Sequence, residues 1–200
     1  MTKRFASLLS ADAGNYKELL KKIENINFDG IHFDIMDGHF VKNFAFSPGI
    51  IKSLRNYTIL PFNAHLEIEN PSDFIDTFID CGCSIITLHP QTCNIERELR
   101  YLRARNVTAS VAIDPDIKIS EIFNYLGLID NIIIMTVYPG FGKQKFIENS
   151  FEKIKNLKEI IIKNKLNITI SVDGSVSKQN EQLLINAGCD ILIYGSSLFN

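Results

Sequence analysis

The sequence predicts a single α/β domain folded as a closed parallel barrel, a (β/α)8 barrel. Short apolar runs rich in β-branched residues alternate with longer segments of helical period, and eight such runs occur. Strands that alternate with helices pair in parallel, and eight parallel strands close into a barrel. A count of six would favour an open, doubly wound sheet, which we keep as the alternative.

The expected strands are short and apolar. In order they are Arg4–Leu9, Gly30–Ile35, Ile59–Leu66, Ser84–His89, Val107–Ala112, Asn131–Val137, Ile168–Val172 and Ile191–Tyr194. The expected helices are Asn15–Ile26, Pro48–Asn56, Ser72–Cys81, Ile95–Arg105, Ile119–Leu126, Ser150–Asn164 and Lys178–Ala187. Within the longest of these, Phe151, Ile154, Leu157 and Ile161 have the spacing of a buried stripe.

Composition limits the function classes. Residues 1–200 form one domain by length, and 46% of them are hydrophobic, enough for a packed core. The net charge is −2, from 21 basic and 23 acidic residues, which argues against nucleic acid or a membrane surface as partner. The N-terminus carries no signal peptide pattern, and the four cysteines lack a disulfide or zinc spacing. We expect free thiols and a cytoplasmic location.

Polar residues gather where a barrel enzyme has its active site, at the carboxyl ends of strands. His32 and Asp34 lie two apart on the second strand and therefore share a face. His65 ends the third strand and Asp173 ends the seventh. Two imidazoles and two carboxylates suit one divalent ion of the Zn²⁺, Fe²⁺, Mn²⁺ or Co²⁺ type.

Each of these residues also has an ordinary structural explanation. A lone histidine on a strand is commonly a core residue, as we expect of His39 and His89 unless they lie in loops. A lone aspartate is commonly a cap or turn residue, as Asp37 before Gly38 indicates. The joint placement of four ionisable groups favours function, because burying them together is costly without a metal or mutual pairing.

Small residues follow the last three strands and predict a phosphate site. Glycines allow backbone N–H groups to approach an anion, and barrel phosphate sites commonly use these loops. The three loops contain Gly140, Phe141, Gly142 and Lys143; Gly174 and Ser175; and Gly195 and Ser196.

These stretches resemble the ribulose-phosphate 3-epimerase family over the whole chain. The matching segments are SLLSAD (7–12), HFDIMDGHFV (32–41), HL (65–66), MTVYPGFG (135–142), QKF (144–146), VDG (172–174) and GS (195–196). The second-strand motif together with the Pro-Gly-Phe loop is highly specific. The resemblance implies a TIM barrel and a ketose-phosphate substrate of the pentose phosphate pathway.

The resemblance also implies residue roles. The metal ligands would be His32, Asp34, His65 and Asp173, with Asp34 as proton acceptor and Asp173 as donor. Ser7 and His65 would touch the substrate. The three glycine-containing loops would hold the sugar and its phosphate. Two carboxylates suit an inversion at carbon 3, because a proton leaves one face and another arrives on the opposite face. A divalent cation would stabilise the enediolate charge between the two steps.

Departures from the family pattern leave alternatives open. Glu67 stands where the family usually has Met, and Lys42, Tyr138 and Ser175 replace the usual Pro, Asn and Gly. The segments ITLHP (86–90), MTV (135–137), VDGS (172–175) and LFN (198–200) resemble the related allulose-6-phosphate 3-epimerases, which act on a six-carbon ketose. D-ribulose 5-phosphate to D-xylulose 5-phosphate is our first expectation, and D-allulose 6-phosphate is the second.

Two further hypotheses differ in class. An aldolase- or decarboxylase-type barrel would need a Schiff-base lysine or a Lys-Asp network, but no lysine falls at a strand end. An inactive barrel that only binds a sugar phosphate is the non-enzyme alternative. The sequence also stops soon after the eighth expected strand, so we expect most of an eighth helix to be lacking. An uncovered strand would expose an apolar strip, which predicts a homo-oligomer.

Overall fold

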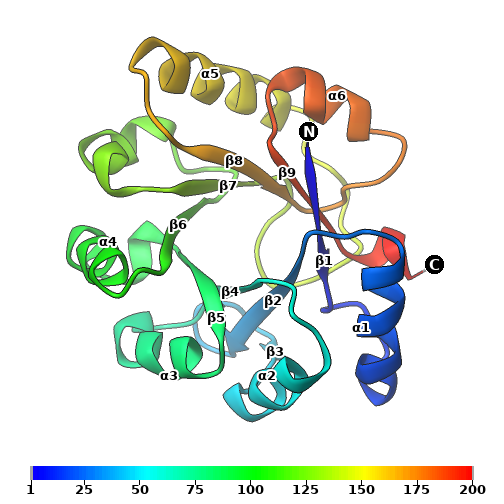
Figure 1. The fold of residues 1–200 in the computed structure, drawn as a ribbon. Helices are drawn as coiled ribbons and strands as arrows, with labels where there is room; N and C mark the ends of the chain where they lie inside the picture. Colours follow the sequence, from blue (N-terminus) through cyan, green and yellow to red (C-terminus); the bar gives the residue numbers. More distant parts are fainter. Residues whose placement is uncertain (1, 200) are drawn as a thin grey trace.

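The computed structural model describes residues 2–199, and the eight expected strands form a closed barrel (Figure 1). The barrel strands are β1 (Lys3–Ser7), β2 (Gly30–Asp37), β4 (Phe62–Glu67), β5 (Cys83–Leu88), β6 (Thr108–Ile113), β7 (Asn131–Met135), β8 (Thr169–Asp173) and β9 (Ile191–Tyr194). Every neighbouring pair is parallel, and β1 pairs with both β2 and β9. This closure confirms the barrel and excludes the open sheet.

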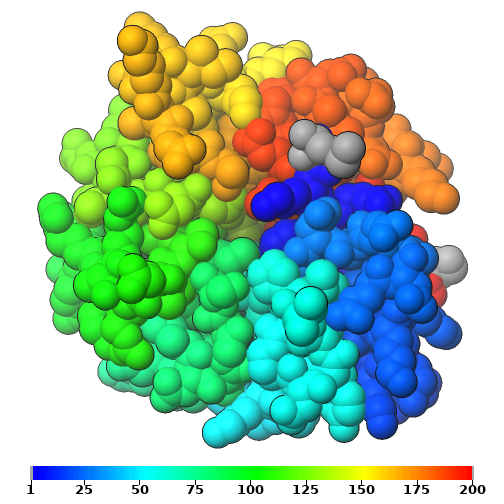
Figure 2. All heavy atoms as spheres, viewed as in Figure 1, coloured from blue at the N-terminus to red at the C-terminus, as the bar shows by residue number. Residues whose placement is uncertain are grey.

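Helices surround the barrel in chain order. They are α1 (Tyr16–Asn25), α2 (Pro48–Leu54), α3 (Ile75–Asp80), α4 (Ile95–Ala104), α5 (Ser150–Lys163) and α6 (Glu181–Ala187). The colours of the space-filling view run once around the molecule, so the first and last segments of the described chain are neighbours (Figure 2). None of the helices within residues 2–199 is both long enough and apolar enough to cross a membrane.

Two elements differ from expectation. The segment expected as an α-helix at Ile119–Leu126 is a 3-10 helix over Ile119–Leu128. A short strand, β3 (Phe44–Ala45), pairs antiparallel with the end of β2 and was not expected. After β9, the last element of the described residues is a 3-10 turn at Ser196–Leu198.

The core has two parts. The larger part lies between the strands and the helices, where Ile154, Leu157 and Ile161 of α5 are buried, as their spacing predicted. A smaller cluster fills the barrel itself and consists of Phe5, Ala112, Ile133, Met135 and Ile193. Buried polar pairs, such as Asn63 with Thr87 and Asn131 with Ser110, occupy the interior as well. The barrel is therefore a packed core, and its carboxyl-end mouth is the place left for a site.

Candidate active site at the barrel mouth

The strand register brings the predicted metal ligands together. Ile31, Phe33 and Ile35 of β2 pack in the outer core, so His32 and Asp34 face the barrel interior. Asp34 lies beside His65 on β4, because these residues are partners in the parallel ladder. Asp173 ends β8 and completes the group.

The four side chains are in mutual contact. Nε2 of His32 lies 3.2 Å from Oδ1 of Asp34 and 3.4 Å from Oδ2 of Asp173. Nδ1 of His65 lies 3.5 Å and 3.8 Å from the same two oxygens. Ser7 fixes the other oxygen of Asp34, since its hydroxyl donates a 2.7 Å hydrogen bond to Oδ2.

The side chains of this cluster shift one another's pKa values. Burial alone would lower the pKa of His32, but the charges and hydrogen bonds of Asp34 and Asp173 outweigh it and raise that pKa to about 10. For Asp34, burial opposes ionisation, yet His32 and His65 hold its pKa well below the usual range. Burial lowers the pKa of His65. Without a metal, the cluster therefore contains an ion pair of His32 with Asp34, beside a neutral His65.

The donor set fits a divalent cation. One donor atom from each of His32, Asp34, His65 and Asp173 lies within 4.8 Å of all the others. Nδ1 of His65 is buried and has no hydrogen-bond partner among the described residues, although it faces two carboxylates. A neutral imidazole nitrogen facing carboxylates in this way is poorly satisfied, and a cation between them would satisfy all three groups.

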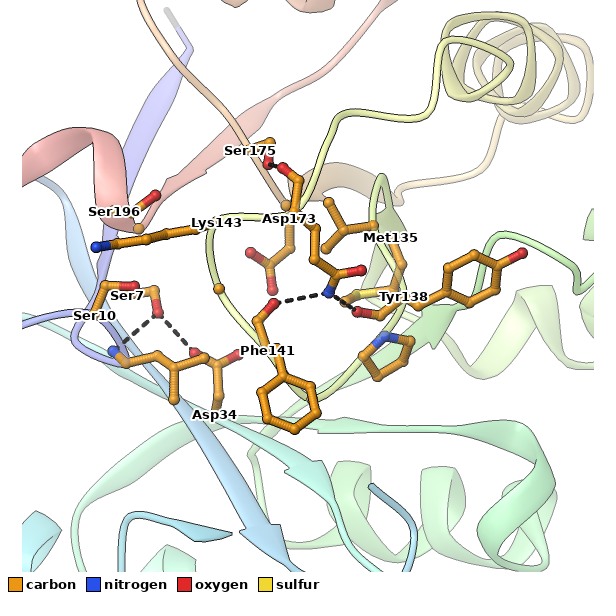
Figure 3. Close-up of a pocket in the computed structure, with 18 of the residues that line it drawn as sticks. Ser7, Ser10, Asp34, Met135, Tyr138, Phe141, Lys143, Asp173, Ser175 and Ser196 are labelled. Carbon is orange, nitrogen blue, oxygen red and sulfur yellow. Dashed lines mark hydrogen bonds between the residues drawn. The ribbon is translucent and has the colours of Figure 1, made fainter. Parts of the chain in front are cut away.

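A cavity opens above this cluster (Figure 3). Asp34 from β2 and Asp173 from β8 both point into it, and Lys143 extends on the side of Ser10 and Ser196. The cavity is lined by all but one of the residues expected to touch substrate: Ser7, Gly140, Phe141, Gly142, Lys143, Gly174, Ser175, Gly195 and Ser196. His65, the exception, is fully buried, as is His32, and neither lines the cavity.

The loops after β8 and β9 present free amide groups to the cavity. The N–H groups of Ser175, Gly195 and Ser196 have no backbone hydrogen-bond acceptor among the described residues. Gly174 has a φ of +112°, and a Cβ there would lie 2.9 Å from the backbone nitrogen of Val137. Glycine is thus required for this close approach, and the free amides form a cradle suited to an anion.

Hydrogen bonds within the loop after β7 hold it in place. Nε2 of Gln144 donates hydrogen bonds of 2.6 and 2.8 Å to the carbonyl groups of Tyr138 and Phe141. The hydroxyl of Ser175 donates to the carbonyl of Gln144, which ties this loop to the one after β8. The expected phosphate loops therefore form one connected wall.

Two buried residues near the site, Glu67 and His89, were not assigned a role in it from the sequence. Glu67 lines the cavity and is 1% exposed; burial and the charges of Asp34 and Asp173 raise the pKa of its carboxyl well above the usual value. Glu67 lies two residues after His65 on β4, so the two-residue period of a strand indicated its direction. His89 is fully buried against His65, whereas His39 lies exposed in a loop.

A closed barrel with paired carboxylates, a metal-type donor set and an anion cradle at its carboxyl-end mouth defines a class: a barrel enzyme for small phosphorylated substrates. Comparison with known proteins narrows the class. The chain belongs to the ribulose-phosphate 3-epimerase family, whose model matches residues 4–199. It is therefore an enzyme of the epimerase type, within the isomerases.

Curated relatives match along their length. The chain is 37% identical to ribulose-phosphate 3-epimerase of Bacillus subtilis (strain 168), covering 100% of this chain and 93% of the relative. It is 35% identical to the chloroplastic ribulose-5-phosphate-3-epimerase of Arabidopsis thaliana, covering 96% of this chain and 70% of the relative.

Solved structures show the fold. A 3-hexulose-6-phosphate synthase from Salmonella typhimurium superposes with a TM-score of 0.73 at 16% identity, covering 99% of this chain and 90% of that one. Phosphoribosyl anthranilate isomerase from Thermotoga maritima gives 0.68 at 13% identity, covering 98% and 89%. At such identities the likeness concerns the barrel alone.

Proposed function

We propose that this enzyme inverts carbon 3 of a ketose phosphate, D-ribulose 5-phosphate to D-xylulose 5-phosphate, with a divalent metal ion and two carboxylates. The observation that carries the proposal is the placement of Asp34 and Asp173 on β2 and β8, pointing into one cavity. Family membership and the names of the relatives support the substrate.

The residues act in a definite order. The carboxylate of Asp34 removes the proton from carbon 3, and Ser7 keeps this carboxylate oriented through its hydrogen bond to Oδ2. The substrate passes through an enediolate, and Asp173, which starts this direction in its protonated form, delivers its proton to the opposite face and is left as a carboxylate. In the reverse direction the two carboxylates exchange roles.

The remaining residues bind the phosphate and the metal ion and shield the reacting carbon from water. The free amides of the loops after β8 and β9, together with Lys143, would hold the phosphate. His32, Asp34, His65 and Asp173 would hold the metal ion, which supplies positive charge to stabilise the enediolate oxygens. The Met36 and Met135 side chains line the same cavity and limit water near the reacting carbon.

Exchange of the carbon-3 proton of D-xylulose 5-phosphate with solvent deuterium tests the role of Asp173, which removes that proton in the reverse direction. Asp173→Asn should reduce this exchange and the epimerisation by at least about 10²-fold, because a neutral amide cannot carry the proton. Asp80→Asn, at an exposed aspartate on α3, is the matched control and should behave as wild type. Exchange at the wild-type rate in Asp173→Asn would remove Asp173 from the mechanism.

The length of the sugar is tested by parallel assays with ribulose 5-phosphate and allulose 6-phosphate, with metal supplied. Turnover of neither substrate would refute the epimerase assignment.

We also propose that the enzyme is a cytoplasmic homo-oligomer. A monodisperse monomer in light scattering would contradict the proposed assembly.

A further inference from the structure

Behind the ligand cluster lie a buried histidine and a partly buried aspartate that the proposed mechanism does not use. His89 follows β5 and is fully buried, and Asp114 follows β6. Nε2 of His89 lies 2.8 Å from Nε2 of His65, and the two rings are stacked, 15° apart in plane. Nδ1 of His89 lies 3.0 Å from Oδ1 of Asp114. A polar chain thus runs from the ligand cluster through His65 and His89 to Asp114.

For Nδ1 of His65 to bind a cation, the protons must follow one distribution along this chain. Asp114 is ionised, since His89 and Gln91 hold its pKa below the usual value despite burial. A lone pair on Nδ1 of His89 would repel that carboxylate at 3.0 Å, so Nδ1 carries the proton. With one proton on its ring, His89 has a lone pair on Nε2, which accepts a hydrogen bond from Nε2–H of His65. Nδ1 of His65 is left with its lone pair facing Asp34 and Asp173.

Asp114 is itself held in place. Nε2 of Gln91 donates a 2.6 Å hydrogen bond to its other carboxylate oxygen. Nζ of Lys153, on α5, donates hydrogen bonds of 2.9, 2.8 and 2.8 Å to the carbonyl groups of Asp114, Pro115 and Ile117. The contact between Nδ1 of His89 and Oδ1 of Asp114 is not aligned as a hydrogen bond, yet neither atom has another partner among the described residues. The loop is therefore fixed, and the contact is chiefly electrostatic.

The other ligand histidine has no such support. Nδ1 of His32 is buried without a hydrogen-bond partner in residues 2–199. Its orientation depends on its contacts with Asp34 and Asp173. Of the two imidazoles, only His65 is oriented from outside the ligand cluster.

We propose that His89 and Asp114 are positioning residues that fix the tautomer of His65, so that Nδ1 of His65 is ready to bind the metal ion. The inference rests on the metal-dependent function proposed above and adds two residues to it. Outer partners that fix a ligand histidine in this way typically change metal affinity by about 10- to 100-fold.

Zinc affinity of the purified enzyme, measured by competition with a chromogenic chelator, tests the proposal. Asp114→Leu should bind Zn²⁺ about 10- to 100-fold more weakly than wild type. Asp114→Asn should restore part of this affinity, because its amide oxygen can face Nδ1–H of His89 but carries no full charge. Asp116→Leu removes an exposed carboxylate two residues away and is the control, expected to bind as wild type.

The outcomes separate the inference from the proposed function. Wild-type enzyme that takes up no divalent ion refutes the metal-dependent function. Wild-type enzyme that binds Zn²⁺, with folded Asp114→Leu binding it equally well, refutes the positioning role. Melting temperatures of the variants establish which of them are folded.

A direct measurement on wild-type enzyme covers the case in which Asp114→Leu does not fold. The chain has four histidines, so their ring ¹⁵N signals can be assigned, with exposed His39 as the reference. His89 should show the Nδ1–H tautomer both with and without Zn²⁺, and Zn²⁺ should shift Nδ1 of His65. An Nε2–H tautomer at His89, with or without Zn²⁺, overturns the proposal.

Discussion

At the residue scale, the charge on His32 links metal binding to pH. With its pKa raised to about 10 by Asp34 and Asp173 against burial, His32 is protonated in the metal-free enzyme at neutral pH. Nε2 must lose this proton to bind a metal ion. The same shift stabilises the metal-free fold fully below the ordinary pKa near 6.5, and this contribution is lost as the pH rises through about 10.

Metal binding should therefore release about one proton at pH 7.5. Calorimetric titration with Zn²⁺ in two buffers of different ionisation enthalpy measures this release. Apparent affinity should also rise about tenfold per pH unit until the pH approaches the pKa of His32. Heats that are equal in the two buffers would show that His32 is already neutral.

Glu67 is the second residue whose charge the fold alters. Its raised pKa means that the folded state favours the neutral acid, so Glu67 lowers stability at any pH above the ordinary value of 4.5. In metal-free protein, Glu67→Gln should gain stability relative to wild type between pH 5 and pH 8. The gain should grow with pH above the ordinary value of 4.5, because the ionised form of Glu67 is penalised by burial and by Asp34 and Asp173.

Urea unfolding with a chelator present measures this difference. Glu69→Gln, two residues further along and exposed, is the matched control and should show no comparable pH-dependent gain. A constant difference between Glu67→Gln and wild type across this pH range would mean that Glu67 is ionised in the folded enzyme.

Residue spacing predicted much of this site. His32 and Asp34 share a strand face by the two-residue period, and the resemblance supplied the roles of His65 and Asp173. The outer partners could not be predicted in the same way. His89 and Asp114 end different strands, and their contact depends on the stagger between β5, β6 and their loops, which no local pattern encodes.

At the element scale, the turn after β8 places the anion cradle. Gly174→Ala should destabilise the fold by about 1–3 kcal/mol, because it forces a side chain into a left-handed conformation and against the backbone of Val137. It should also raise KM, since the displaced loop carries the free amide of Ser175.

Gly127→Ala is the matched control, because a Cβ at Gly127 meets nothing within 4 Å and the backbone there is not left-handed. Denaturant unfolding and steady-state kinetics of both variants give the comparison. An unchanged KM in a destabilised Gly174→Ala would separate the turn from substrate binding.

Elements with a strong period were predicted to within a few residues, as for Ile191–Tyr194, which is β9 as expected. The segment Ile119–Leu128 was not, because its only fully buried residue is Ile122 and it contains Gly127. Such a segment gains little from packing one face, so a tighter 3-10 winding replaces the α-helix. The two residues of β3 are too few to show any period.

At the scale of the whole molecule, ligand binding and folding should be linked. The cavity draws residues from β1, β2, β4, β7, β8 and β9 or the loops that follow them, so an unfolded chain cannot form it. A sugar phosphate at about 100 times its Kd should therefore raise the free energy of unfolding by about 2.7 kcal/mol. Thermal unfolding with ribulose 5-phosphate, against equimolar ribulose as control, measures the effect. Equal stabilisation by both compounds would show that the phosphate contributes little.

The pairing of β1 with β9 has a consequence for synthesis. Ser7 and Ser196 line the same cavity although 189 residue numbers separate them, so a chain still leaving the ribosome holds one wall of its site without the other. Until β9 emerges, β1 and β8 each have an unpaired edge, the kind of surface on which nascent chains associate wrongly or recruit chaperones. Catalysis would begin only after β9 has emerged, and a cell that slowed translation just before β9 would prolong the stage at which β1 and β8 are unpaired.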